Sequence, residues 1–456
     1  MKTNVNWLLA FGWLFLAVST AQAQFDYSTN GNAITITGYT GSGGAVTIPP
    51  EINGFPVTSI GSGAFYEGFE PPGVPSESIV TAVVIPSSVT NIGSYAFEGC
   101  NYLTTVTLGN GLISIDADAF SGCTTLSGIA IPNGVTSIGD SAFSGCSDLS
   151  SLPLPESVTN LGEGVFNGSG LTSFSIPSVI TSITQSLFED CGNLTNVVIP
   201  SSVTTIDAYA FEGCGSLTSI AIPNSVITIW DLAFQYAGIT NINIPNSVSY
   251  IGSDVFFGCA NLTSVAIPLG ITSIVYGTFN SCVSLTNVTI PDTVTDIATN
   301  AFFDCSALVN IKIPGSVTNI AFHSFAGCSS LSGIYFLGNS PHYDPDVFDG
   351  VGDAIVYYLP GTTGWYSVFG GLATTLWTLP YPVILKNSSN FGVHGGEFGF
   401  TISWATNISV VVEGCANLAA PVWQPLQTNS LSSGTAYFSD PQWNTYPGRF
   451  YRLSPQ

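Results

Sequence analysis

A repeat of 23 residues runs through most of this 456-residue chain and limits its fold more than any other feature. The unit reads CxxLTxIxIPxxVTxIGxxAFxG, and its phenylalanine recurs every 23 or 22 residues after one first interval of 32. A period of this length is typical of a solenoid, in which each repeat forms one coil. The position is held by Phe65, Phe97, Phe120, Phe143, Phe166, Phe188, Phe211, Phe234, Phe256, Phe279, Phe302, Phe325 and Phe348.

Each unit is expected to contain one short strand, as residues 217–223 (LTSIAIP) illustrate. Because side chains alternate across a strand, Leu217, Ile220 and Ile222 should point inward. Ser219 and Ala221 should then face outward. The proline that closes the segment cannot donate a ladder hydrogen bond, so it ends the strand.

A single unit cannot fold alone, because it buries too few apolar side chains to offset the entropy lost when its backbone is ordered. Val226 and Ile229 should return the chain through the core, where Phe234 fills the space between coils. Stacking would pair each strand with its neighbours in a parallel sheet. We therefore predict a core ladder built from the phenylalanines between Phe97 and Phe325.

This pattern of Cys, Leu, Ile, Ile-Pro, Val-Thr, Ile-Gly and Ala-Phe resembles the BspA-like, or Treponema-type, leucine-rich repeats. The resemblance covers residues 48–348, about two thirds of the chain. It implies a curved right-handed solenoid of the kind found in surface and secreted proteins of bacteria and some protists. It also implies a role in adhesion or protein binding.

The first 23 residues read as an export signal. Lys2 supplies a basic start, residues 7–18 an apolar run, and Ala21 and Ala23 a small-residue cleavage site. The mature chain would begin at Gln24 without a transmembrane segment and be secreted or held at the cell surface. A retained N-terminal anchor is the alternative.

The overall expectation is a mainly β protein in five parts. The signal peptide (1–23) is followed by an N-terminal cap (24–47), in which the runs near 33–37 and 45–48 pair as a β-hairpin. A solenoid of about 13 repeats (48–350) comes next. An insertion at 67–81 is either a contact loop or a tolerated surface loop. A closing cap (351–380) precedes a small antiparallel, sandwich-like β-module (381–456), because short β-type runs are separated there by Gly, Pro, Asn and Ser.

The β-module carries Trp404, Trp423 and Trp443, and its predicted strands lie near 399–404, 408–413, 435–438 and 450–453. Aromatic side chains fill cores and also stack on sugar rings. We predict that these tryptophans fill the core, with sugar stacking as the alternative.

Charge is scarce and mostly negative, with five basic and 28 acidic residues. Without Lys2, four basic residues against 28 acidic ones leave a net charge of −24. Nucleic acid is therefore excluded as a partner, because phosphate binding needs a clustered basic surface.

Nine of the ten cysteines occupy one repeat position, and Cys415 stands apart. We interpret the column as buried free thiols, since one residue per coil provides no tetrahedral metal site. Occasional disulfides between neighbouring coils and metal binding are the alternatives. The column consists of Cys100, Cys123, Cys146, Cys191, Cys214, Cys259, Cys282, Cys305 and Cys328.

Catalytic and metal motifs are weak. An acidic stretch that begins at His342 and ends at Asp353 lacks the glutamate of a calcium loop, and residues 359–364 (LPGTTG) depart from a sortase signal. His323, His342 and His394 are the only histidines, and no nucleophile elbow accompanies them. We predict no cofactor, no metal site and no enzyme activity, and a secreted hydrolase remains a minor alternative.

The outward strand positions are small and neutral, so they offer hydrogen bonds and flat area rather than acid–base chemistry. We predict that this face binds a protein partner at the cell exterior. Glycan binding by the Trp-rich C-terminal module is the alternative, and an ice-binding face fits less well because Gly, Ala and Asn interrupt the columns. The candidate face consists of Thr105, Thr107, Ser173, Ser175, Asn196, Ser219, Asn241, Asn243, Ser264, Asn287 and Thr289.

Overall fold

The computed structural model describes residues 24–66, 79–377, 382–386, 389–403, 408–432 and 434–455. The predicted signal peptide, residues 67–78 of the predicted insertion and Trp404 lie outside the described residues. The chain forms two compact units, of which the first ends at Ser264 and the second begins at Val265. Among the described residues, no helix has the length and apolar character needed to cross a bilayer.

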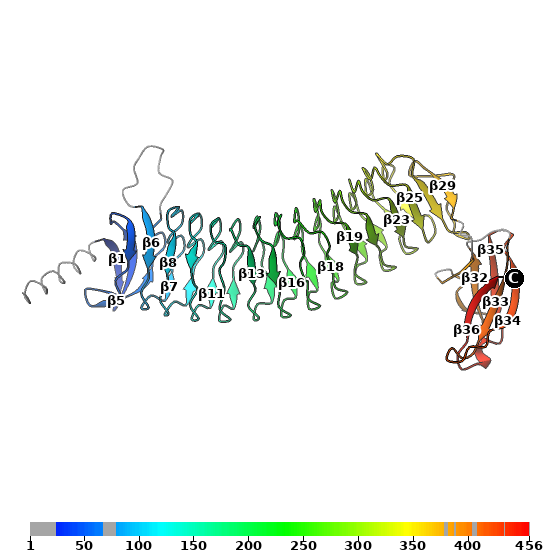
Figure 1. Ribbon diagram of the computed structural model, residues 1–456, viewed down its shortest axis with the longest axis horizontal. Helices are drawn as coiled ribbons and strands as arrows, with labels where there is room; N and C mark the ends of the chain where they lie inside the picture. The colour runs from blue at the N-terminus through cyan, green and yellow to red at the C-terminus, as the bar shows by residue number, and fades with distance from the viewer. Residues whose placement is uncertain are drawn as a thin grey trace, which may run out of the picture. The chain divides into compact units, whose positions relative to one another are not determined.

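In the first unit, successive coils lie side by side and contribute short strands to two rows of parallel pairing (Figure 1). The first row follows the predicted strand position, and the second follows the VTxI segment, for which the sequence predicted no strand. First-row strands are β3 (Gly44–Thr47), β6 (Val80–Val84), β8 (Thr105–Thr107) and β10 (Gly128–Ile129), then β13 (Ser173–Ser175) and β15 (Asn196–Val198). Second-row strands are β7 (Asn91–Ile92), β9 (Ser114–Ile115), β11 (Ser137–Ile138), β12 (Asn160–Leu161), β14 (Ser182–Ile183), β16 (Thr205–Ile206), β17 (Thr228–Ile229) and β18 (Tyr250–Ile251).

The inward and outward pattern within a coil is as predicted. Leu217 is fully buried, and Ile220 and Ile222 are at most 8% exposed. Ser219 and Ala221 are exposed. Residues 217–223 nevertheless form only an isolated bridge, from Ala221 to Asn243, so this coil keeps the strand register without a full strand.

The N-terminal cap is a β-hairpin, but the predicted pairing is wrong. The hairpin joins β1 (Phe25–Asn30) to β2 (Ala33–Tyr39), and β2 continues in parallel with β5 (Phe55–Ile60). The run near 45–48 lies in β3, which pairs with β6 in the other row. A further short strand, β4 (Glu51–Ile52), pairs with β5. The two apolar runs therefore begin the two rows instead of pairing with each other.

The phenylalanine ladder is confirmed within each unit. From Phe65 to Phe256 in the first unit, neighbouring rings stack with centroids 4.7–6.2 Å apart. From Phe279 to Phe348 in the second unit, the spacing is 5.2–5.7 Å. Every ring from Phe97 to Phe325 at this position is less than 2% exposed. Each coil thus supplies one layer of a core that it could not close alone.

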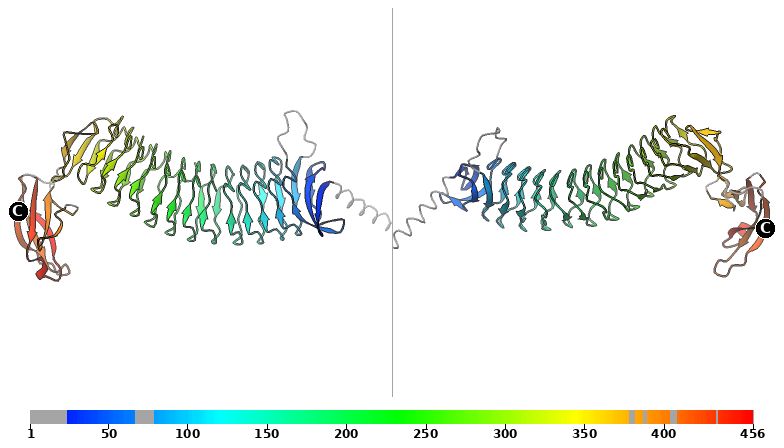
Figure 2. Two further views of the ribbon diagram at one scale, coloured as in Figure 1. Left: turned by 180° about the vertical axis from the view of Figure 1, so that it is seen from behind. Right: turned by 45° about the horizontal axis from the view of Figure 1, so that its top comes forward.

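The second unit begins with coils of the same type (Figure 2). Its first row extends beyond the last phenylalanine of the repeat, through β27 and β29, with β28 (Val368–Phe369) antiparallel to β29. First-row strands are β19 (Ser264–Ala266), β21 (Asn287–Thr289), β23 (Asn310–Ile313), β25 (Gly333–Phe336), β27 (Ile355–Tyr358) and β29 (Leu372–Leu376). Second-row strands are β20 (Ser273–Ile274), β22 (Asp296–Ile297), β24 (Asn319–Ile320) and β26 (His342–Tyr343).

The end of the repeat core is covered by aromatic side chains. Trp365 packs against Phe336 and Phe369 with ring centroids 5.0 and 5.3 Å away. Its indole Nε1 donates to Thr362 Oγ1 at 2.9 Å, within the LPGTTG segment. Gly361 and Gly364 in this segment have φ of 84° and 86°, so the segment is a turn, as predicted.

The C-terminal module consists of two antiparallel sheets. The first contains β30 (Val383–Leu385), β31 (Gly392–His394), β32 (Glu397–Ser403) and β35 (Thr435–Asp440), and the second contains β33 (Ser409–Cys415), β34 (Gln424–Ser430) and β36 (Phe450–Pro455). All four predicted strands are present. The core consists of Phe400, Ile402, Val410, Val412, Leu431 and Phe438.

Candidate functional site

The predicted binding face lies on the outward side of the first row. Ten of its eleven residues are exposed, and Ser264 is half-buried. The register places Ser173 beside Asn196 and Ser175 beside Val198 in the first unit. Strand pairing therefore aligns the polar side chains of Ser173 and Asn196 in one outward column, whereas the other outward column places Ser175 beside the exposed Val198.

Two neighbouring columns of this row differ in their hydrogen bonding. In the first column, Thr104, Thr172, Thr195 and Thr263 donate their hydroxyls to a carbonyl of the preceding coil, as Thr195 does to Thr172 O at 2.9 Å. The next residue along the chain, Asn196, makes no side-chain hydrogen bond to another described residue. The same holds for the rest of the candidate face except Asn241 and Ser264, which bond to each other at 3.2 Å. The threonine column thus holds coils together, while the adjacent column remains available to a ligand.

In the second unit, the outward side of the first row carries an aromatic cluster that the sequence did not indicate. Tyr335 and Tyr357 are register partners and stack with ring centroids 4.8 Å apart. Trp377 lies 4.7 Å from the Tyr335 ring, and the exposed Lys312 is the register partner of Tyr335 on the other side. Burial and the neighbouring Tyr357 raise the pKa of Tyr335. Only the parallel register brings these four residues together.

The cysteine column is buried, as predicted, and none of the ten cysteines forms a disulfide. The thiols donate to carbonyls of the preceding coil, as Cys214 Sγ does to Phe188 O at 3.1 Å. Burial raises the pKa of Cys146 and of Cys259 to about 12. Such thiols are poor nucleophiles and poor metal ligands, because both roles require the thiolate.

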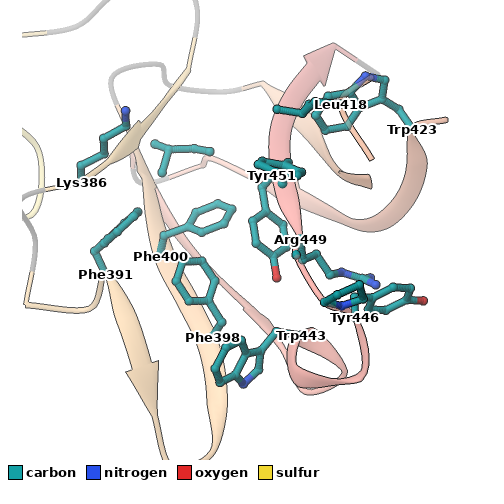
Figure 3. Close-up of a pocket in the computed structure, with 14 residues that line it drawn as sticks. Lys386, Phe391, Phe398, Phe400, Leu418, Trp423, Trp443, Tyr446, Arg449 and Tyr451 are labelled. Carbon is teal, nitrogen blue, oxygen red and sulfur yellow. The ribbon is translucent and has the colours of Figure 1, made fainter. Parts of the chain in front are cut away.

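A second candidate surface is a pocket of about 560 Å³ in the C-terminal module. Figure 3 shows Phe398 and Phe400 projecting from β32 toward Tyr451 of β36, with Trp443 beside Phe398. Trp443 is fixed by a bond from its Nε1 to Gly396 O at 3.0 Å. The walls therefore come from two sheets and from the loop that precedes β36.

The wall of the pocket that carries Tyr446 and Tyr451 is held by contacts with Arg449 and Asp440. Arg449 Nε lies 2.6 Å from Asp440 Oδ2, and its guanidinium carbon lies 4.0 Å from the centre of the Tyr446 ring. Tyr451 also donates to Asp440, at 3.0 Å. Burial first, and then the bond to Asp440, raise the pKa of Tyr451, so its hydroxyl stays protonated and donating.

The prediction that tryptophans fill the module core is wrong for the two that are described. Trp423 and Trp443 are half-buried and line the pocket, outside the six-residue core. The guanidinium carbon of Arg452 lies 4.5 Å from the centre of the Trp423 ring, and Arg452 pairs with Glu413 at 2.6 Å. Trp423 thus has a cation on its ring instead of core side chains around it.

The profile of BspA type leucine-rich-repeat regions matches four overlapping segments, 76–194, 113–237, 181–308 and 228–353, which together span more than half of the chain. The chain belongs to the BspA-type leucine-rich-repeat family.

The chain is also similar to solved structures. A leucine-rich repeat protein from Bacteroides ovatus is 30% identical over 77% of this chain and 98% of its own, with a TM-score of 0.65. A leucine rich cell surface protein from Faecalibacterium prausnitzii is 28% identical over 69% of this chain and 94% of its own, with a TM-score of 0.45. None of the curated proteins compared with the chain matches it.

The three histidines and the acidic stretch after His342 are the remaining candidate positions of this BspA-type chain. His323 stacks on Phe322 with ring centroids 3.7 Å apart, and His342 Nδ1 lies 3.1 Å from Asn319 Oδ1. His394 ends strand β31. Within the described residues, no group of three or more His, Cys, Asp or Glu side chains is arranged to hold a metal ion. The acidic stretch after His342 keeps Phe348 in the ladder, as expected for turn residues.

Proposed function

We propose that this chain is a non-catalytic extracellular binding or adhesion protein that presents the outward side of its first row to a protein partner. The observation that carries the proposal is the contrast between adjacent columns. Thr172 and Thr195 donate to the preceding coil, whereas the residues that follow them, Ser173 and Asn196, expose polar groups without partners among the described residues. The columns run along rigid coils, so they offer a preorganised surface.

Secretion or surface retention is part of the same proposal. It is supported by the apolar run and small-residue site in the first 23 residues, and by the family to which the repeats belong. Sequencing the N-terminus of protein recovered from outside the cells should give Gln24 as the first residue. An unprocessed N-terminus would instead support a retained anchor.

The face can be tested by placing a photo-crosslinking residue at Asn196 or Ser219, with Asn160 as the control. Asn160 is also an exposed polar residue, but it lies in the second row. With extracellular and surface proteins of the native host, we expect one protein to crosslink from both face positions and not from Asn160. The triple change Ser173→Lys, Asn196→Lys and Ser219→Lys should weaken its binding at least 10-fold. Equal crosslinking from Asn160, or none from the face, contradicts the proposal.

A second candidate function, glycan binding by the C-terminal module, is favoured by one observation. Trp423 and Trp443 present partly exposed rings to a pocket instead of filling the core. Aromatic faces suit the C–H surfaces of sugar rings, because both are apolar while the sugar hydroxyls can remain in water.

A further inference from the structure

Basic residues are concentrated at the aromatic pocket of the C-terminal module. Outside residues 1–23, the chain has four of them, and Lys386 and Arg449 line the pocket. Arg452 lies against Trp423, which lines it too. Only Lys312 lies elsewhere. In a chain with net charge −23, this placement gives residues 381–456 three cations against three carboxylates.

The individual cations have different roles. Arg449 is 91% buried and paired with Asp440, so it mainly fixes the wall that carries Tyr446 and Tyr451. Arg452 is paired with Glu413 and covers one face of Trp423. Lys386 is exposed, lines the pocket, and has no ion-pair partner among the described residues. Its ammonium group is therefore the cation available to an anionic ligand.

The pocket walls are apolar, partly exposed and held in place. Phe391 is 39% exposed and Tyr446 is 37% exposed. Covering such rings removes apolar surface from water, which favours binding. Because Trp443, Tyr446 and Tyr451 are fixed by contacts with Gly396, Arg449 and Asp440, little side-chain entropy is lost when a ligand binds.

These features select among ligand classes. A peptide backbone would bring amide groups into an aromatic pocket that offers few hydrogen-bond partners, which is costly. An acyl chain would satisfy the rings and leave the lysine without a role. A sugar ring places its C–H face on an aromatic side chain and keeps its hydroxyls at the rim. A carboxylate on another unit of the same saccharide would pair with Lys386.

We propose that this pocket binds a carboxylate-bearing oligosaccharide, such as a short segment of a polysaccharide built from uronic acids. The rings of Trp443 and Tyr446 stack on one sugar unit, and Lys386, which lies at the other end of the pocket in Figure 3, binds the carboxylate of another unit of the same chain. This inference rests on the glycan-binding candidate and does not depend on the protein-binding face of the repeats.

The test is calorimetric titration of the full chain with oligogalacturonate, alginate and hyaluronan oligosaccharides. We expect at least one of them to bind, and its methyl-esterified form, which lacks the charge, to bind 5-fold to 10-fold more weakly. Lys386→Gln should weaken binding by a similar factor, and Trp443→Ala or Tyr446→Ala by 10-fold or more. Lys312→Gln and Tyr437→Ala are matched controls, since both residues are exposed and neither lines the pocket.

The outcomes separate the inference from the candidate function on which it rests. Equal affinity for the esterified form, or for a neutral glucan oligosaccharide, overturns the acidic-sugar assignment and keeps glycan binding. No binding to any saccharide overturns both. Binding to polyglutamate or to anionic phosphatidylglycerol vesicles that is lost with Lys386→Gln shows a peptide or a lipid site instead. If Trp443→Ala unfolds the module, Tyr446→Ala, at a partly exposed ring, decides the result.

Discussion

The repeats and the C-terminal module differ in how they form a hydrophobic core and in how their charges are balanced. All but three of the 28 acidic residues precede the module, which balances Glu397, Glu413 and Asp440 with Lys386, Arg449 and Arg452. The repeats stack identical rings into a core that extends from coil to coil, whereas the module closes six side chains into a core of its own. Periodicity thus provides a long surface with little chemical variety, and the module provides one distinctive pocket.

The largest expected effect is the loss of stability when a core phenylalanine is replaced, and it should be confined to the region, repeats or module, that contains the change. Phe211→Ala should destabilise the repeats by about 3–5 kcal/mol, because Phe211 stacks on Phe188 and Phe234 and its loss leaves a cavity between three coils. Hydrogen exchange followed by mass spectrometry should show lost protection in the adjacent coils and unchanged protection in the module. Phe438→Ala, in the module core, should give the reverse pattern. Loss of protection in both regions from either change would show one cooperative unit and break the comparison.

Because of the buried cysteine column, we predict that the free energy of unfolding decreases at alkaline pH. Because burial raises the folded-state pKa of Cys146 and Cys259 to about 12, the unfolded chain releases these protons first, from a reference value of 9.0. Their stabilising contribution is therefore complete below pH 9 and is lost as the pH rises toward 12. The expected loss is on the order of 1 kcal/mol per thiol for each pH unit in this window.

Urea unfolding at pH 8, 9 and 10 measures this loss, with the double variant Cys146→Ala and Cys259→Ala as the comparison. The variant should be less stable at pH 8 and should depend less steeply on pH. Identical pH dependence in the two proteins would assign the alkaline loss to tyrosines and other groups, and the thiol column would have no part in it.

Sequence reasoning was most reliable where one residue type repeats at one spacing. The phenylalanine ladder and the buried thiols followed from that regularity, because each position has the same surroundings in every coil. The second row was missed because its strands, such as Ser137–Ile138, are two residues long and show no alternation. The cap pairing was wrong because residues 33–37 and 45–48 alternate alike, and alternation does not say which strand pairs with which.

The aromatic pocket of the module and the aromatic cluster of the repeats could not be predicted, because their residues are brought together only by the fold. Trp443 and Phe398 are far apart in the chain, and they meet at the pocket only because β32 and the loop before β36 come together. Tyr335, Tyr357 and Trp377 meet only through the parallel register. A count of tryptophans in residues 381–456 indicated a core, because local composition does not distinguish a ring inside a sandwich from a ring at its edge.

A smaller effect should separate the two columns of the binding face. Thr195→Ala removes a hydroxyl that bonds to Thr172 O and should cost about 1 kcal/mol. Asn196→Ala, one residue further along the chain, should change stability by no more than about 0.5 kcal/mol, because its side chain is exposed and has no partner among the described residues. Urea midpoints of the two variants provide the measurement. Equal losses would mean that both columns hold coils together, which would remove the main support for the proposed face.

The smallest effect concerns the acidic turns of the repeats, where carboxylates face each other without cations. Burial first, and then the charges of Glu189 and Asp190, raise the pKa of Glu212. Its protonated form is therefore favoured in the folded state, so stability should rise as the pH falls from 7 toward the reference value of 4.5. At pH 7, Glu212→Gln should raise the free energy of unfolding by about a few tenths of a kcal/mol, because solvent partly screens the site. The urea midpoint should rise accordingly, and the free energy of unfolding should depend less on pH. A lower midpoint at pH 7 would show that the Glu212 carboxylate stabilises its turn and that repulsion there is outweighed.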